Sequence, residues 1–528
     1  MPDDEFMRGA VTIRMYRDIL GDCFLLRFPG ATATFNVLID SGILQGMPGA
    51  KERARRIMSD VASLAPRIDL LVITHEHVDH LSCFHQARDI FDRLDIGELW
   101  LAWTEDPRDE QAAKLRTGRA QAMALLERSH SALAALMSSE PSTDDDDEAP
   151  TEGRSNGLEA LKGLMAFSGR DPSQPPAAPG GSTGEILAYL RGKAKRVTYL
   201  QPGGAPRAFN GVADLSVYVL GPPKVEALLK RSNPHRHSSE VYELDAETIQ
   251  DDLFLVAALN ATSDASELDV DDIAKLRLSL PFGFKNLIAT EPRSRSFGAP
   301  ADDSAWTKFE ALYGRRDDEW RRIDTDWLGA TEQLALKLDS DTNNTSLVLA
   351  FRLGDGADGR VLLFPGDAQV GNWLSWHEHV WPPMAKKGEP GTVTAEDLLA
   401  MTVLYKVGHH ASHNATLREG GLESMTHRDL VAMVPVHQEF ANGTKRWNMP
   451  FPSLLQRLEQ KTGGRVIRAD KGKMELEVAA KQYAGQAGGL EAGELQRFLS
   501  CVREITDPDG PLAMEYRIPW PGATDSNP

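Results

Sequence analysis

Short apolar runs bounded by turn residues recur along about the first 105 residues of the chain and again in later blocks. Runs of this kind, ended by pairs such as Gly21–Asp22 and Pro29–Gly30, predict β-strands. The predicted strands of the first block are 11–16, 23–28, 36–40, 69–73 and 99–103. The later ones are 195–200, 215–220, 346–351, 361–364, 403–407 and 430–434. We therefore expect a core of β-sheets whose strands are interrupted in the sequence by two insertions.

The first interruption combines a helix with polar linkers. Residues Pro107 to Met137 predict a helix with Asp106 as its N-cap and Pro107 at its first position. The segments Ser138 to Thr151 and Asp171 to Thr183 are rich in Ser, Pro, Asp and Gly. Such segments bury too little apolar area to offset the entropy of ordering, so we expect mobile linkers around a short helix near Leu158 to Phe167.

The second interruption, at about 224–340, mixes helical and polar patterns, and its fold cannot be assigned from them. The stretch after about Ala484 is expected to be peripheral. Two layers of strands flanked by helices predict an α/β fold, an αββα sandwich with two insertions. The expected parts are the first half of the sandwich (1–105), the first insertion (106–194), core strands (195–223), the second insertion (224–340), the second half (341–484) and a C-terminal extension (485–528).

Composition narrows the class of protein. With 528 residues and 41% hydrophobic content the chain can bury a large core. Three widely spaced cysteines argue against a disulfide framework, and no apolar leader or run of eighteen apolar residues is present, which predicts a cytoplasmic protein without a membrane segment. The formal charge of −19, five units of which come from residues 144–148, repels polyanions at long range. This charge disfavours a nuclease without excluding one.

The most informative motif follows the predicted strand 69–73. Three imidazoles and a carboxylate, His75, His77, Asp79 and His80, lie within six residues. A strand that ends in a loop can direct His75 and His77 at one cation and Asp79 and His80 at a second. A solvated loop is the bland alternative, but HxHxDH after a buried strand is far more specific than a lone histidine pair.

Two further motifs also follow predicted strands. Gly366–Asp367 comes directly after 361–364, and Lys406 to Asn414 follows 403–407 and contains His409, His410 and His413. A Gly-Asp pair alone reads equally well as a turn. Its position beside a second histidine cluster favours a shared site.

The combined pattern resembles the metallo-β-lactamase-fold hydrolases and, within them, the ComEC-like branch. The resemblance covers residues 11 to about 105, 195–223 and 341–478, and both insertions lie outside it. The matching motifs are Gly21–Asp22, Leu38-Ile39-Asp40-Ser41-Gly42, the HxHxDH itself, Asn343 to Val348, Gly366–Asp367 and Lys406 to Ser412.

The resemblance implies a set of metal ligands and a reaction type. It makes His75, His77, Asp79 and His80 ligands and Asp367 a bridging carboxylate. One of His409 and His410 is the last ligand; we favour His410, which leaves His409 facing the substrate. The implied cofactor is zinc, up to two ions per chain, with manganese as the alternative, and Asp79 and Asp367 would hold the nucleophilic hydroxide.

Several positions depart from the full pattern or remain open. The ligand histidine between HxHxDH and the bridging Asp has no convincing counterpart, because His130, His235 and His237 are expected at the surface. Phe451 stands where the branch has a histidine, and His437 is a weak replacement. Asp40 is expected to orient a ligand imidazole, with a turn as the alternative. His413 is a candidate proton donor or phosphate contact, or else an exposed loop residue.

Three functions compete at this point. The first is a metal-dependent phosphodiesterase or nuclease, the second a hydrolase of a lactone, thioester or lactam, and the third a regulatory subunit whose metal site is structural. Binding of nucleic acid needs cationic and aromatic residues, and a protein partner could use 138–183 or 224–340. The candidates for nucleic-acid contact, each equally well a solvated helix face, are Arg293, Arg295, Phe297, Arg315, Arg316, Trp320, Arg321, Arg322, Trp327, Lys386 and Lys387.

Overall fold

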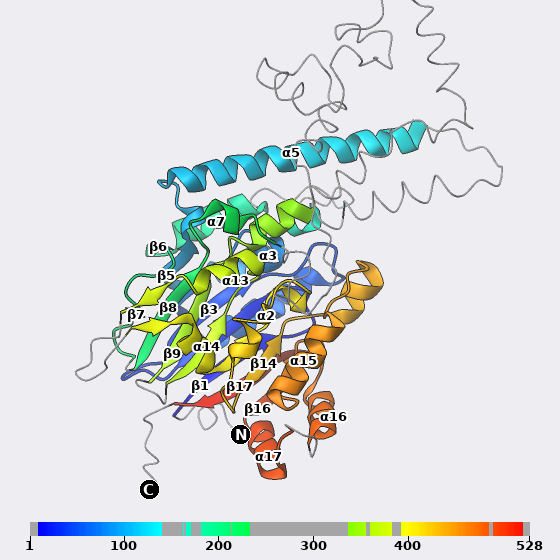
Figure 1. Cartoon of the computed structure of the whole chain (residues 1–528). Helices are drawn as coiled ribbons and strands as arrows, with labels where there is room; N and C mark the ends of the chain where they lie inside the picture. Colours follow the sequence, from blue (N-terminus) through cyan, green and yellow to red (C-terminus); the bar gives the residue numbers. More distant parts are fainter. Residues whose placement is uncertain are drawn as a thin grey trace, which may run out of the picture. The chain divides into compact units, whose positions relative to one another are not determined.

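The computed structural model describes residues 9–139, 162, 165–169, 181–212, 214–232, 336–354, 359–382, 392–484 and 489–520 (Figure 1). The chain divides into two compact units. The first comprises 1–115, 166–248 and 339–528, and the second comprises 116–165 and 249–338. Both sheets and all six of the predicted metal ligands belong to the first unit.

The first sheet has eight strands in the order β16-β17-β1-β2-β3-β4-β5-β6. Pairing is antiparallel from β16 through β3 and parallel from β3 through β6. Its strands are β1 (Ala10–Tyr16), β2 (Cys23–Phe28), β3 (Phe35–Ser41), β4 (Arg67–Val72), β5 (Asp95–Ala102), β6 (Arg196–Leu200), β16 (Val502–Asp507) and β17 (Gly510–Pro519).

The second sheet has seven strands in the order β15-β14-β13-β10-β9-β8-β7. Strands β10, β13, β14 and β15 run parallel to one another, and β7, β8, β9 and β10 pair antiparallel. Its strands are β7 (Arg207–Ala208), β8 (Leu215–Gly221), β9 (Val348–Leu353), β10 (Arg360–Phe364), β13 (Thr402–Lys406), β14 (Val431–Val434) and β15 (Val466–Arg468). A separate ribbon pairs β11 (Val380–Trp381) with β12 (Val393–Thr394).

Alternate residues of the strands face the other sheet. The rings of Phe24 and Phe364 lie 5.5 Å apart, and those of Phe28 and Phe351 lie 5.9 Å apart, so the two sheets pack face to face. Leu25, next to Phe24, instead joins a cluster that includes helix residues. This two-residue period separates an inner face from an outer face that the helices cover, which makes the fold αββα, as predicted.

The helices follow the strands in chain order, and several begin at recognisable caps. Helix α7 begins after Ser182, whose hydroxyl accepts from the Glu185 amide, and α15 has Pro452 in its first turn. The helices are α2 (Ala50–Leu64), α3 (Val78–Gln86), α4 (Arg88–Phe91), α5 (Glu110–Ser139), α7 (Thr183–Lys193), α8 (Glu226–Leu229), α13 (Val370–Trp376), α14 (Ala395–Ala400), α15 (Pro452–Thr462), α16 (Lys473–Tyr483) and α17 (Ala492–Ser500).

The predicted strands are all present, with ends shifted by a few residues. The predicted start of α5 is wrong: the helix begins at Glu110, and Asp109 accepts from the Ala112 amide at 2.9 Å. Asp106 instead accepts from the backbone and side chain of Arg108. Two aspartates, Asp106 and Asp109, compete for the cap here, and local contacts decide between them.

The expectation of a peripheral C-terminal stretch is also wrong. Strand β17 pairs with the whole length of β1, from Ala10 opposite Pro519 to Tyr16 opposite Ala513. The Arg14 guanidinium on β1 donates to Glu515 on β17 at 2.8 Å and to Asp60 on α2 at 2.7 Å. The C-terminal strand therefore belongs to the core of the first sheet.

Most of the two insertions lies outside the described residues. This applies to nearly all of the predicted linkers at 138–151 and 171–183, to His235 and His237, and to every predicted nucleic-acid contact from Arg293 to Lys387. His130 on α5 is buried, contrary to the expected surface position. Within the described ranges, none of the helices combines the length and apolar character needed to cross a membrane.

Candidate metal centre

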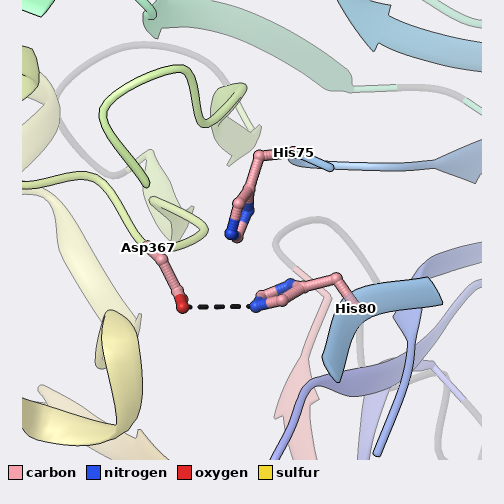
Figure 2. Close-up of side chains that lie close together, drawn as sticks. All are labelled: His75, His80 and Asp367. Carbon is pink, nitrogen blue, oxygen red and sulfur yellow. Dashed lines mark hydrogen bonds and ion pairs between the residues drawn. The ribbon is translucent and has the colours of Figure 1, made fainter. Parts of the chain in front are cut away.

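The candidate metal centre lies where strands of both sheets end. The segment from Thr74 to His77 follows β4, and α3 begins at Val78 with Asp79 and His80 in its first turn. Asp367 follows β10, and His409 and His410 follow β13. Figure 2 shows His75, which follows β4, and His80, on α3, pointing towards Asp367, which follows β10.

Two glycines allow the backbone to approach the site closely. A Cβ atom at Gly42 would lie 2.1 Å from the carbonyl carbon of Asp79, and one at Gly21 would lie 2.3 Å from the Gly42 oxygen. The Asp22 amide donates to the Asp79 carbonyl at 3.0 Å, which ties the three segments together. Any side chain at Gly42 would displace Asp79 and His80, which gives the early Gly-Asp and Asp-x-Gly motifs a physical reason.

Five of the six predicted ligands fall into overlapping clusters of candidate donor atoms. His80 Nε2 lies 3.2 Å from Asp367 Oδ2 and 3.6 Å from Asp79 Oδ2. His410 Nε2 lies 3.1 Å from Asp79 Oδ2. Among the described residues, the clusters are His75–His80–Asp367, Asp79–Asp367–His410 and Asp22–Asp40–His80. The sixth ligand, His77, adjoins them, with its Nδ1 3.0 Å from His75 Nε2.

The ring nitrogens that face away from the centre lie within hydrogen-bond distance of other protein groups. His80 Nδ1 lies 2.8 Å from Asp40 Oδ2, and His410 Nδ1 lies 2.5 Å from the Pro435 carbonyl oxygen. His75 Nδ1 lies 3.1 Å from the Thr74 hydroxyl. Each partner fixes the tautomer and leaves the Nε2 lone pair directed into the centre. The hydrogen bond expected of Asp40 is therefore present.

Asp367 has one oxygen engaged and one directed at the ligands. Its Oδ1 accepts from the His409 backbone amide at 2.9 Å and from Lys406 Nζ at 3.1 Å. Lys406 also lies 2.5 Å from Asp22 Oδ2. The other oxygen, Oδ2, faces His80 and would be available to a cation.

The pKa values divide the imidazoles into two groups. Burial lowers the pKa of His75 well below its usual range and lowers that of His77 to about 3. Burial also acts against protonation of His80, but carboxylates led by Asp367 and Asp79 outweigh it and raise the His80 pKa well above its usual range. The pKa of His410 is raised as well, because the hydrogen bond to Asp79 and the nearby carboxylates outweigh burial.

The donor set fits a divalent cation. Asp22, Asp40, Asp79 and Asp367 are all buried, and Lys406 forms ion pairs with two of them, Asp22 and Asp367. Asp79 Oδ1 is buried without a hydrogen-bond partner among the described residues. Several buried carboxylate oxygens beside imidazole nitrogens are the environment that zinc or manganese stabilises.

The two remaining predicted catalytic residues lie outside these clusters. His409 is buried beside the centre, with Nδ1 3.0 Å from the Ser412 hydroxyl and Nε2 3.5 Å from Asn343 Nδ2. Burial lowers its pKa to about 4, which keeps the ring neutral at pH 7 and unsuited to donating a proton as an imidazolium. His413 is half-buried and its ring lies 6.1 Å from that of Phe451.

Sequence reasoning missed two groups beside the centre. Phe167 lies with its ring 5.5 Å from His77 and stacks on Trp447 at 4.8 Å, and no local signal marks it. Asp339 lies with Oδ1 3.7 Å from His77 Nε2. Asp339 is four residues before Asn343 on one helical segment. Residues four apart lie on the same face of a helix, so the position of the Asn-Asn motif could have pointed to Asp339.

Comparison with known proteins agrees with this geometry for one part of the chain. Residues 17–98, which include HxHxDH, match the family model described as the metallo-beta-lactamase superfamily. No curated protein and no solved structure gives a significant match. The superfamily domain, the αββα fold and the buried donor set together indicate a metal-dependent hydrolase.

Proposed function

We propose that this chain is a metal-dependent phosphodiesterase or nuclease, similar to the ComEC-like branch, and that it resides in the cytoplasm. The observation that carries the proposal is the shared position of Asp367. Its Oδ2 faces His80 of one ligand group, while His75 belongs to the same cluster. We further propose that the bound ions are zinc, with manganese as the alternative, held by His75, His77, Asp79, His80, Asp367 and His410.

The protein's own residues fix the geometry of this reaction. Divalent cations at the centre would lower the pKa of a bound water and stabilise the charge that grows on the substrate oxygen. Asp79 and Asp367 would position that water, and Lys406 keeps Asp367 ionised, since it holds the pKa of this carboxyl well below its usual range against the effect of burial. The His409 backbone amide fixes Asp367 Oδ1.

The surroundings of the centre favour a phosphodiester that carries an aromatic ring. Phe167 and Trp447 stack with an interplanar angle of 14°, and Phe167 lies beside His77 and His409. Lys445 Nζ lies 6.0 Å from the Trp447 ring. Trp447 is partly exposed beside Lys445, whereas Phe167 is buried; an exposed aromatic ring next to a cation can bind a base and a phosphate of a single strand. The net charge of −19 weakens long-range attraction of long duplexes, so we favour a short strand or a small phosphodiester.

An activity screen tests the proposal. The purified protein, supplied with zinc or manganese, is assayed on bis-p-nitrophenyl phosphate, single-stranded and duplex DNA, RNA and a lactone. We expect phosphodiester cleavage that a chelator abolishes and that added metal restores, with Asp367→Ala as the inactive comparison. Cleavage of the lactone alone would favour the small-molecule hydrolase, and metal binding without any hydrolysis would favour the regulatory subunit.

A further inference from the structure

The outward ring nitrogens of three ligand imidazoles have partners within hydrogen-bond distance, and His77 is the remaining, informative case. For His75, His80 and His410, these partners are the Thr74 hydroxyl, Asp40 and the Pro435 carbonyl. In His77 the nitrogen that faces the centre is Nδ1, 3.0 Å from His75 Nε2. The group that faces its Nε2 should therefore hold this ring in place.

Asp339 occupies that position. Its Oδ1 lies 3.7 Å from His77 Nε2, and its side chain is nine-tenths buried, with 10% exposed. Among the described residues this oxygen has no hydrogen-bond partner, whereas Oδ2 accepts from Asn343 Nδ2 at 3.1 Å. An approach of well under 1 Å would turn the 3.7 Å separation into an ordinary hydrogen bond.

We propose that Asp339 is the positioning residue for His77: it accepts a hydrogen bond from Nε2–H and thereby directs Nδ1 at the cation shared with His75. The inference rests on the proposed metal centre. This role would also compensate for the missing mid-chain histidine. A pair of imidazoles held rigidly in place can keep its affinity for a metal ion with one ligand fewer.

A direct ligand role for Asp339 fits the geometry less well. Among the described residues, Asp339 belongs to none of the clusters in which three candidate ligand atoms lie together. It faces Nε2, while Nδ1 of the same ring faces His75. Asp339 therefore lies behind the imidazole, in the same relation that Asp40 has to His80.

The test compares Asp339→Ala and Asp339→Asn with wild type, and Asp341→Ala serves as a matched control from the same helical segment. Zinc affinity is measured by competition with a chromophoric chelator, and the coordination of the bound metal is followed by the visible absorption of the cobalt-substituted protein. We expect Asp339→Ala to weaken one site about 10- to 100-fold and to shift its cobalt spectrum. Asp339→Asn should retain most of the affinity, because the amide oxygen accepts the same hydrogen bond, and Asp341→Ala should match wild type.

Each outcome decides a separate point. Equal losses in the Asn and Ala variants, with a lower coordination number, would overturn positioning in favour of direct ligation. Unchanged affinity in both variants would overturn the inference while leaving the metal centre intact, whereas a wild-type protein that binds no divalent cation would overturn the proposed function itself. If Asp339→Ala does not fold, nitrogen-15 NMR of wild type still decides: a His77 protonated at Nε2 is expected, and one protonated at Nδ1 contradicts the proposal.

Discussion

The candidate centre has two halves that share Asp367 but differ in chemistry. One half consists of Asp79, His80 and His410, in which Asp79 lies between the two rings and both outward nitrogens have strong acceptors. The other half consists of His75 and His77, whose Nε2 and Nδ1 atoms lie 3.0 Å apart, and the carboxylate that clusters with His75 is the shared Asp367. The first half is carboxylate-rich, and the second is supported by hydroxyl groups and, at longer range, by Asp339.

This difference has an electrostatic consequence. Carboxylates around His80 and His410 raise the pKa of both rings, so the first half holds protons when no cation is bound. For His75 and His77, burial outweighs the nearby carboxylates, and the pKa values of both rings are lowered. The half with His80 and His410 must therefore lose protons when a metal ion binds. The half with His75 and His77 is already neutral and loses none.

The largest effect should come from removing the residue that both halves share. Asp367→Ala would remove a candidate ligand from each half and one of the two carboxylates that pair with Lys406, so hydrolysis should fall at least about a hundredfold. Steady-state rates with zinc or manganese supplied provide the measurement, and exposed Asp89→Ala is the control. Wild-type rates in Asp367→Ala would remove the proposed mechanism.

Paired variants should separate the halves. Asp79→Ala with His80→Ala should release at least one metal ion per chain, and His75→Ala with His77→Ala should release the ion of the other half. Elemental analysis of the purified proteins gives the counts. Equal metal content in wild type and in the Asp79–His80 double variant would contradict the assignment of that half.

Proton release on metal binding should distinguish the halves further. A ligand imidazole must be neutral, so below its raised pKa His80 loses a proton when metal binds, and affinity at this half rises with pH by about tenfold per unit for each proton displaced. His77, with a pKa of about 3, releases none at neutral pH. Calorimetry of the two double variants in buffers of different ionisation enthalpy measures the protons, and equal release by both would refute the difference.

The smallest effect should come from His413→Ala. Its ring faces Phe451 and is half-buried outside the ligand clusters of the described residues. A proton donor typically contributes about 10²- to 10⁴-fold, and solvent can substitute in part, so the loss should be milder than for Asp367→Ala. A loss of activity as large as that of Asp367→Ala would indicate that His413 takes part in catalysis.

The sequence by itself determined the features that depend on neighbours in the chain. HxHxDH places His75 to His80 on one strand end and one helix turn, and the two-residue period marks the strands that carry it. Gly366–Asp367 and His409–His410 were identified in the same way, because each follows an apolar strand directly. Short-range geometry suffices for such motifs.

Only the tertiary structure decided the contacts between distant segments. The place of β17 beside β1 depends on a register across about 500 residues and on Arg14 reaching Glu515, which no local pattern specifies. Asp339 meets His77, and Phe167 meets Trp447, only after the two sheets have packed and the chain has returned to the same edge. The sequence therefore identifies the residues that can bind a metal. Packing decides which nitrogen of each imidazole faces the centre and which residues orient the ring.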